Sequence, residues 1–100
     1  MLGFALHLAL ALHNVGMALK LHQLRYLVAI AESGSIRAAA RILGLSQASL
    51  TQALRELEAH SGLGLLERHS RGIGFTPAGQ DLLAQARRVL AQMDKLEQVV

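Results

Sequence analysis

The most constraining feature of this sequence is a very short connection between two segments that both favour helix. Ser35 is placed to cap a helix over 36–43, and Ser46 is placed to cap a second helix over about 46–60, because a serine hydroxyl accepts a hydrogen bond from a free amide of the first turn. The connection contains Gly44 and little else. Two helices joined by a turn of about three or four residues that includes glycine form a helix-turn-helix. Many helical hairpins share this pattern, so the motif needs support from its flanks.

Helical periodicity and turn signals on either side supply that support. Apolar residues recur at helical spacing over Lys20–Glu32, which predicts a helix before the motif. After it, residues 65–75 read as two extended segments around a turn and predict a small hairpin with basic residues at its tip. Thr76 followed by Pro77 predicts the start of a long helix over 77–99. The predicted fold is therefore mainly α: a winged helix-turn-helix of three helices and a two-stranded wing, followed by a long linker or dimerisation helix.

Apolar side chains along the long helix form a heptad seam. Their spacings of four, three, four and three residues are typical of a coiled-coil face, and a helix of about 30 Å would extend beyond so small a core. We therefore predict a homodimer through this helix, and packing of the stripe on its own domain is the alternative. Ile42 and Leu43, by contrast, are expected to turn toward the domain's own core. The predicted dimerisation residues are Leu82, Ala86, Val89, Leu90, Met93 and Leu96.

The first 18 residues differ from the rest because they contain no Lys, Arg, Asp or Glu. They lack the basic start and the cleavage box of a signal peptide, and their apolar stretch is shorter than the roughly 20 residues that span a bilayer. If Met17 is the natural start, residues 1–16 are an upstream extension; alternatively the segment is a short apolar helix packed on the domain or on a partner. The predicted organisation is an extension over 1–18, a winged helix-turn-helix domain over 19–76 and the linker helix over 77–100.

The excess positive charge lies entirely in the middle of the chain. Residues 20–75 hold seven Lys and Arg against four Asp and Glu, whereas the basic and acidic residues of 76–100 balance. A polyanion is the partner that this distribution favours, and a solvated basic surface is the alternative. The chain has no cysteine, which excludes disulfides, thiol catalysis and Cys-bound metals and fits a cytoplasmic location. No catalytic triad, paired carboxylates, phosphate loop or metal-ligand spacing stands out, so we expect no enzyme, cofactor or metal.

Several motifs, matching in order and spacing over about residues 19–98, resemble the amino-terminal domain of LysR-type transcriptional regulators. They are GSIRAAARIL at 34–43, LSQASLT at 45–51, Leu57-Glu58, LLER at 65–68 and FTPAG at 75–79. The chain departs from the family pattern at Ala48, Thr51, Ser61 and Leu66, where Pro, Ser, Leu and Phe are usual. Ala48 and Thr51 lie at the start of the helix predicted over 46–60. The resemblance implies that this start faces the bases of DNA, so these two departures bear on which bases are contacted.

The resemblance implies sequence-specific binding to double-stranded DNA, with the helix over 46–60 in the major groove and the wing over 65–75 on the backbone or in the minor groove. It also implies linker helices that pair antiparallel, and tetramers of full-length proteins. The family's effector-binding domain is expected to be absent from this chain, so no small-molecule site is expected. No membrane partner is expected either, because the apolar stretch near the start is too short to span a bilayer. The candidate DNA-binding residues are Ser35, Arg37, Gln47, Ala48, Ser49, Thr51, Gln52, Arg55, Arg68 and Arg71.

The side chains in this set suit different parts of DNA. The amides of Gln47 and Gln52 can pair with adenine N6 and N7, although a capping role for Gln47 and plain solvent exposure for Gln52 are the alternatives. Arg55 could reach a guanine or a phosphate. The Ser35 hydroxyl and the remaining arginines are expected to hold phosphates.

Other interpretations stay open at this point. Arg68 could instead form an internal ion pair with Glu67 or Glu58, and His69 could be a turn residue without a special role. The chain could also be a winged helix of another family, such as the molybdate-responsive regulators, or a nonspecific nucleoid protein. A module that binds another protein is a further alternative.

Overall fold

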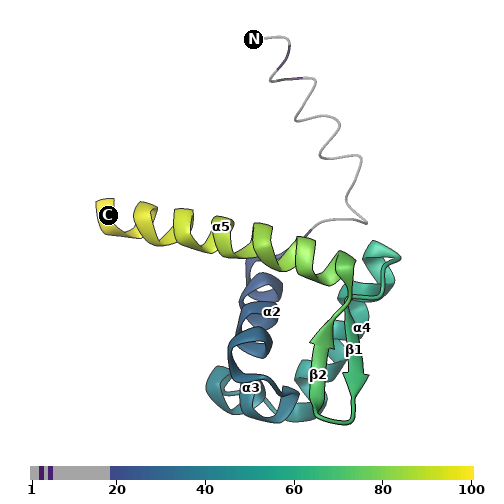
Figure 1. Ribbon diagram of the computed structural model, residues 1–100. Helices are drawn as coiled ribbons and strands as arrows, with labels where there is room; N and C mark the ends of the chain where they lie inside the picture. The colour runs from purple at the N-terminus through teal and green to yellow at the C-terminus, as the bar shows by residue number, and fades with distance from the viewer. Residues whose placement is uncertain (1–2, 4, 6–18) are drawn as a thin grey trace.

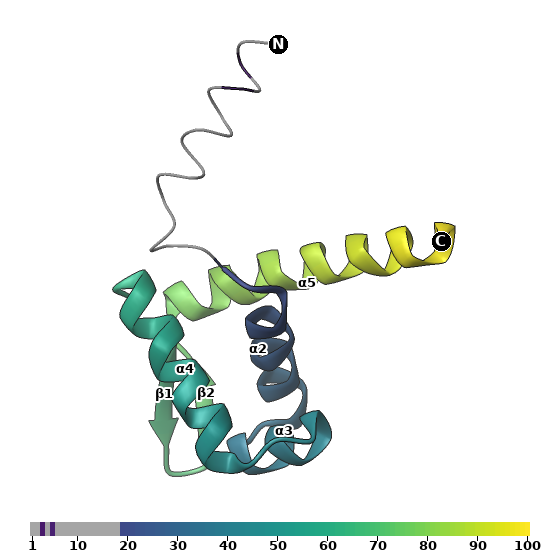
Figure 2. The same cartoon turned by 180° about the vertical axis from the view of Figure 1, so that it is seen from behind.

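The computed structural model describes residues 3, 5 and 19–100 of the chain. Its elements follow the order α2 (Leu21–Ser33), α3 (Ile36–Leu43), α4 (Gln47–Ser61), β1 (Leu66–His69), β2 (Gly72–Phe75) and α5 (Pro77–Val99). Three helices and an antiparallel hairpin form one body, and α5 crosses above it and extends past α2 (Figures 1 and 2). The two interpretations of the extension over 1–18 lie outside the described residues, apart from positions 3 and 5.

Side-chain caps begin the helices where the sequence predicts them. The hydroxyls of Ser35, Ser46 and Thr76 each accept a hydrogen bond from the backbone N–H three residues on, at 3.0 Å in every case. Gly44 ends α3 in the left-handed conformation, with φ of 71°, which glycine adopts without steric cost. The helix-turn-helix connection is therefore as short as predicted, and the winged helix-turn-helix prediction is confirmed.

The core lies where α2, α3 and α4 meet the base of the hairpin. Leu27, Ile30 and Leu50 are completely buried, and Leu65, just before β1, is 1% exposed. The helix α3 contributes small side chains, since Ala39 and Ala40 are its buried residues. Small residues at this position let the neighbouring helices approach closely.

The prediction that Ile42 faces the core is wrong. Its side chain is 69% exposed, whereas Leu43 is half-buried and packs against the core. Each residue of a helix turns the chain by roughly 100°, so Ala39, Ala40 and Leu43 share one face and Ile42 falls away from it.

The wing is tied at its base to both α4 and α5. Its register pairs Leu66 with Phe75 and His69 with Gly72. A carboxylate oxygen of Glu58 on α4 accepts hydrogen bonds from the backbone N–H of Leu65 at 2.7 Å and of Leu66 at 3.4 Å. On the other side, the α5 cap residue Thr76 donates its hydroxyl to the Gly64 carbonyl at 2.6 Å and its N–H to the Leu65 carbonyl at 3.1 Å. These bonds fix the wing relative to α4.

Only the second half of the α5 stripe is free. Ala86 is 1% exposed, and Leu82 packs against the core of its own chain. Val89 and Leu96, by contrast, are 47% and 58% exposed. The prediction that the whole stripe faces a partner is therefore wrong for Ala86, because α5 crosses α2 at this point and leaves no room for a second chain.

Candidate nucleic-acid interface

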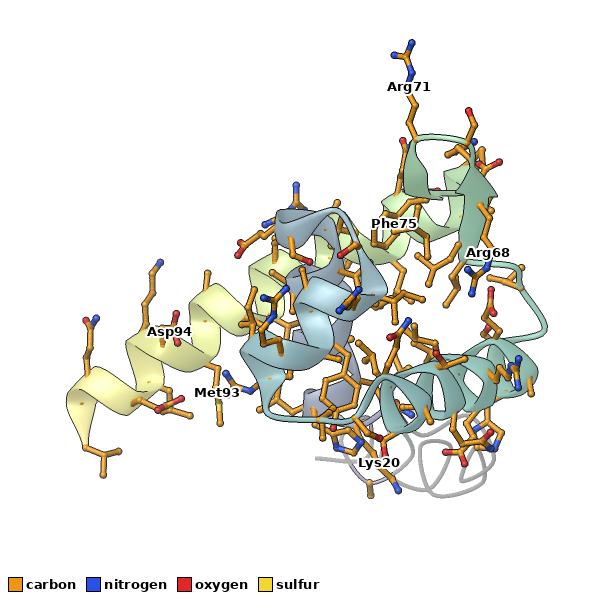
Figure 3. All side chains as sticks on the ribbon, turned by 90° about the horizontal axis from the view of Figure 1, so that it is seen from below. Lys20, Arg68, Arg71, Phe75, Met93 and Asp94 are labelled. Atoms are coloured by element: carbon orange, nitrogen blue, oxygen red, sulfur yellow. The ribbon has the colours of Figure 1, made fainter. Side chains whose placement is uncertain are left out.

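The first turn of α3, the first half of α4 and the wing meet on one side of the molecule. A hollow of about 390 Å³ lies between them and is lined by Ser35 and Arg37 of α3, Gln47 of α4 and Arg68 of β1. A second hollow of about 200 Å³ is lined by Thr51 and Arg55 of α4, again with Arg68. Arg68, labelled on the wing in Figure 3, thus lines both hollows. Six predicted DNA-binding residues, far apart in sequence, line these two hollows.

The remaining predicted residues lie on the surface around these hollows. Ala48, Ser49 and Gln52 are exposed on α4 and line neither hollow. They share a helix whose opposite face, with Leu50 and Leu54, is buried in the core. Arg71 stands at the tip of the wing and points away from the body (Figure 3). The predicted residues therefore form a surface with two hollows and a projecting tip.

The hydrogen bonds of α4 bear on the two alternatives for Gln47 and Gln52. The cap of α4 is Ser46, so the start of the helix needs no capping from Gln47. Ser46 also donates its hydroxyl to the Ser49 hydroxyl at 2.8 Å. The Gln52 amide donates to Glu56 at 3.3 Å, an exposed contact that solvent or another partner can replace at little cost. The polar face of α4 is thus available.

Within residues 19–100, the arginines of this surface form no ion pair. Across residues 19–100, the ion pair that forms is Arg87 with Glu32, at 3.3 Å, between α5 and α2. Glu58, which the sequence offered as a partner for Arg68, is instead bound to the backbone of the wing base. The alternative of an Arg68–Glu58 ion pair is therefore wrong. The exposed cations Arg37, Arg55, Arg68 and Arg71 give this face a net positive charge, although Glu58 lines the smaller hollow beside Arg55 and Arg68.

Sequence reasoning missed three contributors to this region. Ser70 and His69 line the larger hollow with the predicted residues, whereas the sequence suggested only a turn role for His69. Glu58 lines the smaller hollow and also anchors the base of the wing, whereas the sequence suggested it only as a partner of Arg68 and as part of the LysR-like Leu57-Glu58 motif. A hydrogen bond across a loop has no periodic signal in a sequence.

The described residues were also compared with the requirements of a metal site and of a membrane span. Within the described part of the chain, no three His, Cys, Asp or Glu side chains gather as a metal ion would require. Among the helices of that same part, none combines the length and the apolar character of a membrane span.

Comparison with known sequences identifies the domain. The sequence model of the bacterial regulatory helix-turn-helix proteins of the lysR family matches residues 21–80. This chain belongs to the LysR family. The matched range covers α2, α3, α4 and the wing, and it ends in the first turn of α5. The molybdate-responsive alternative is thereby set aside.

Individual LysR regulators match at moderate identity. The HTH-type transcriptional regulator TfdS of Cupriavidus pinatubonensis is 49% identical over 72 residues, which are 72% of this chain and 24% of that protein. ClcR of Pseudomonas putida is 46% identical over 72 residues, with the same two coverages. This LysR chain thus spans about a quarter of the length of the curated relatives that it matches.

Solved structures agree with the sequence comparison. The complex of the CbnR DNA-binding domain with DNA matches with a TM-score of 0.73 at 41% identity, covering 80% of this chain and 92% of that one. The complex of the BenM DNA-binding domain with the catB site 1 DNA matches with a TM-score of 0.77 at 34% identity, covering 81% and 91%. The LysR chain therefore carries the winged helix-turn-helix DNA-binding domain of its family.

Proposed function

We propose that this chain reads specific sequences in double-stranded DNA, with α4 in the major groove and the wing along the backbone or in the minor groove. The observation that carries this proposal is the convergence of α3, α4 and the wing on one surface whose four arginines form no ion pair within residues 19–100. A net positive surface attracts the phosphate backbone. A helix with an exposed polar face fits the width of the major groove.

Base reading is assigned to the exposed face of α4. The amides of Gln47 and Gln52 suit adenine, since each offers a donor and an acceptor to N6 and N7. The Thr51 methyl suits the thymine methyl, and Ala48 offers only an apolar contact. Arg55 lies one turn further along and reaches a guanine or a phosphate. Ser49 completes the set, with its hydroxyl now accepting from Ser46.

Phosphate binding is assigned to the two ends of the surface. Ser35 and Arg37 begin α3 on one side, and Arg68 and Arg71 belong to the wing on the other. Phosphate contacts set register and orientation without carrying sequence information. This division separates residues that determine affinity from residues that determine specificity, so the two can be tested apart.

The chain is proposed to act as a homodimer through the free half of α5. Val89, Met93 and Leu96 lie along this half, and Leu90 flanks them. Leu82 and Ala86 are left out because both pack on their own domain. The bulky domains sit at the start of each α5, so antiparallel pairing keeps them apart and presents two reading surfaces to two half-sites. The proposed role is binding, with no catalytic step.

Selection of bound sequences from random DNA, at a stated salt concentration, tests the reading assignment. Gln52→Ala is expected to relax preference at one base pair by about 1–3 kcal/mol. Arg37→Ala is expected to weaken binding to all sequences alike, because it removes a phosphate contact. Arg41→Ala is the matched control, since Arg41 is an exposed cation at the other end of the same helix. Enrichment of no sequence at all would favour the nonspecific nucleoid alternative.

Light scattering tests the homodimer. Replacing Val89 and Met93 together with Asp places two charges in the proposed seam and is expected to give a monomer. Arg88→Asp is the control, because Arg88 is exposed on the same stretch of α5 outside the seam. A double variant that stays dimeric would reject pairing through α5.

A further inference from the structure

An apolar hollow lies away from the proposed DNA-binding surface, in the corner where α5 leaves the body of the domain. It has a volume of about 350 Å³, and its apolar lining comes from Val28 and Ala29 of α2, Ile42 and Leu43 of α3 and Leu90 of α5. The free half of α5 projects on the side where α3 lies (Figures 1 and 2). We call this site the corner hollow.

Ile42 marks the corner hollow as a surface without a partner in the chain. The side chain is 69% exposed, although it lies beside the half-buried Leu43 and Val28. Val99, at the end of α5, is also highly exposed, at 84%, and Leu96 is 58% exposed. The corner hollow and the last turns of α5 are thus both uncovered apolar surfaces.

Pairing of the free halves of α5 alone makes a small interface. From Arg87 to Val99 the helix is about 20 Å long at 1.5 Å per residue, and only one face of these 13 residues can touch a partner helix. A stable interface typically involves about 20–30 residues on each side. Surface from the body of the domain beside this stretch of α5 would enlarge the interface.

Antiparallel pairing directs the end of one α5 toward the body of the other chain. We infer that, in the homodimer, the last turns of the partner's α5 seat in the corner hollow, with the partner's Leu96 and the partner's Val99 against Ile42 and Leu43. This inference rests on the homodimer proposed above and names a second surface within it. The occupant is thus a second copy of this chain.

The charges at the rim agree with this occupant. Arg25 and Glu32 line the polar edge of the corner hollow. Glu32 already pairs with Arg87, whereas Arg25 forms no ion pair within residues 19–100. The last turns of α5 carry the exposed acids Asp94 and Glu97, so the approaching helix end brings negative charge to a free cation.

This contact would link pairing to DNA reading. Ile42 lies in the last turn of α3, and Arg37 and the Ser35 cap lie at its start. A partner seated on one end of this short helix would fix the position of the other end. The distance between the two reading surfaces, and so the spacing of the two half-sites, would then be set by the corner hollow as well as by the α5 pairing.

Cysteine cross-linking tests the proposed contact in the corner hollow directly, because the chain contains no cysteine of its own. The double variant Ile42→Cys with Val99→Cys is expected to form a covalent dimer under mild oxidation, seen on a non-reducing gel. The matched control pairs Val99→Cys with Leu63→Cys, since Leu63 is 52% exposed and lines a different hollow, at the far end of α4. Equal cross-linking of both, or cross-linking of the control alone, would overturn the inference.

A single substitution gives the energetic test. Ile42→Lys is expected to raise the dimer dissociation constant by about tenfold or more, with helix content unchanged because the side chain is exposed. If the Val89 and Met93 double variant is monomeric but Ile42→Lys changes the constant by less than about twofold, the proposed contact in the corner hollow is wrong and the α5 pairing stands. If that double variant stays dimeric, the proposed homodimer through α5 itself is wrong.

Discussion

Removal of the Glu58 carboxylate is the sharpest test of how the wing is held. Glu58→Ala takes away the acceptor of two backbone N–H groups, of Leu65 at 2.7 Å and of Leu66 at 3.4 Å. A hydrogen bond to a charged acceptor contributes about 1.5–3 kcal/mol, and the longer bond adds little. Leu65 is 1% exposed, so water replaces the lost acceptor poorly. We expect the free energy of unfolding to fall by about 2 kcal/mol, which for a domain of this size lowers the Tm by roughly 8–15 °C.

Thermal unfolding followed by circular dichroism measures this loss. Glu58→Gln keeps a neutral acceptor and is expected to lose about half as much, since charge-assisted bonds are roughly twice as strong as neutral ones. Glu56→Ala is the control, because Glu56 is exposed on the same helix and accepts only from Gln52; its expected change is within about 0.5 kcal/mol. A Glu58→Ala variant no less stable than Glu56→Ala would refute the anchoring role.

Three more predictions concern other contacts. Gly79→Ala is expected to lower the free energy of unfolding in urea by about 3 kcal/mol or more, because the added methyl would overlap the backbone carbonyl of Leu65. Gly64→Ala is the control and should be near neutral, since a methyl there meets open space. Equal losses for the two variants would contradict the close approach of Gly79 to Leu65. Ser46→Ala removes the α4 cap and should cost about 1 kcal/mol, measured in the same way; no loss would mean that the cap is dispensable. Arg71→Ala should lower the slope of log affinity against log salt by about one; an unchanged slope would place the wing tip off the phosphates.

Much of the fold follows from local chemistry that a sequence displays directly. The caps at Ser35, Ser46 and Thr76 lie where the residue types predict them, because capping involves only neighbours along the chain. The turn residues and extended segments over 65–75 predict the wing for the same reason. The motifs over 34–79 predict the family as well as the fold, and the match to the lysR family model confirms the family.

The arrangement of the candidate site depended on contacts between distant residues. Arg68 lies between two hollows because the wing is held against α4, and the bond that holds it, from Glu58 to Leu65, crosses a loop. The sequence offered Glu58 as an ion-pair partner of Arg68, since both are charged and near in sequence. Whether the Glu58 carboxylate accepts from a backbone amide or from a guanidinium is decided by three-dimensional distance.

By itself, the sequence determined the elements, their order, their caps and the family. Only the tertiary structure decided which apolar side chains are covered. Ala86 and Val89 belong to one heptad stripe, yet the first is buried by α2 and the second is free; Ile42 and Leu43 are neighbours, yet only Leu43 packs on the core. Periodicity specifies a face of a helix, whereas burial depends on what lies opposite that face. That difference restricts the dimer seam to the free half of α5 and exposes the corner hollow beside it.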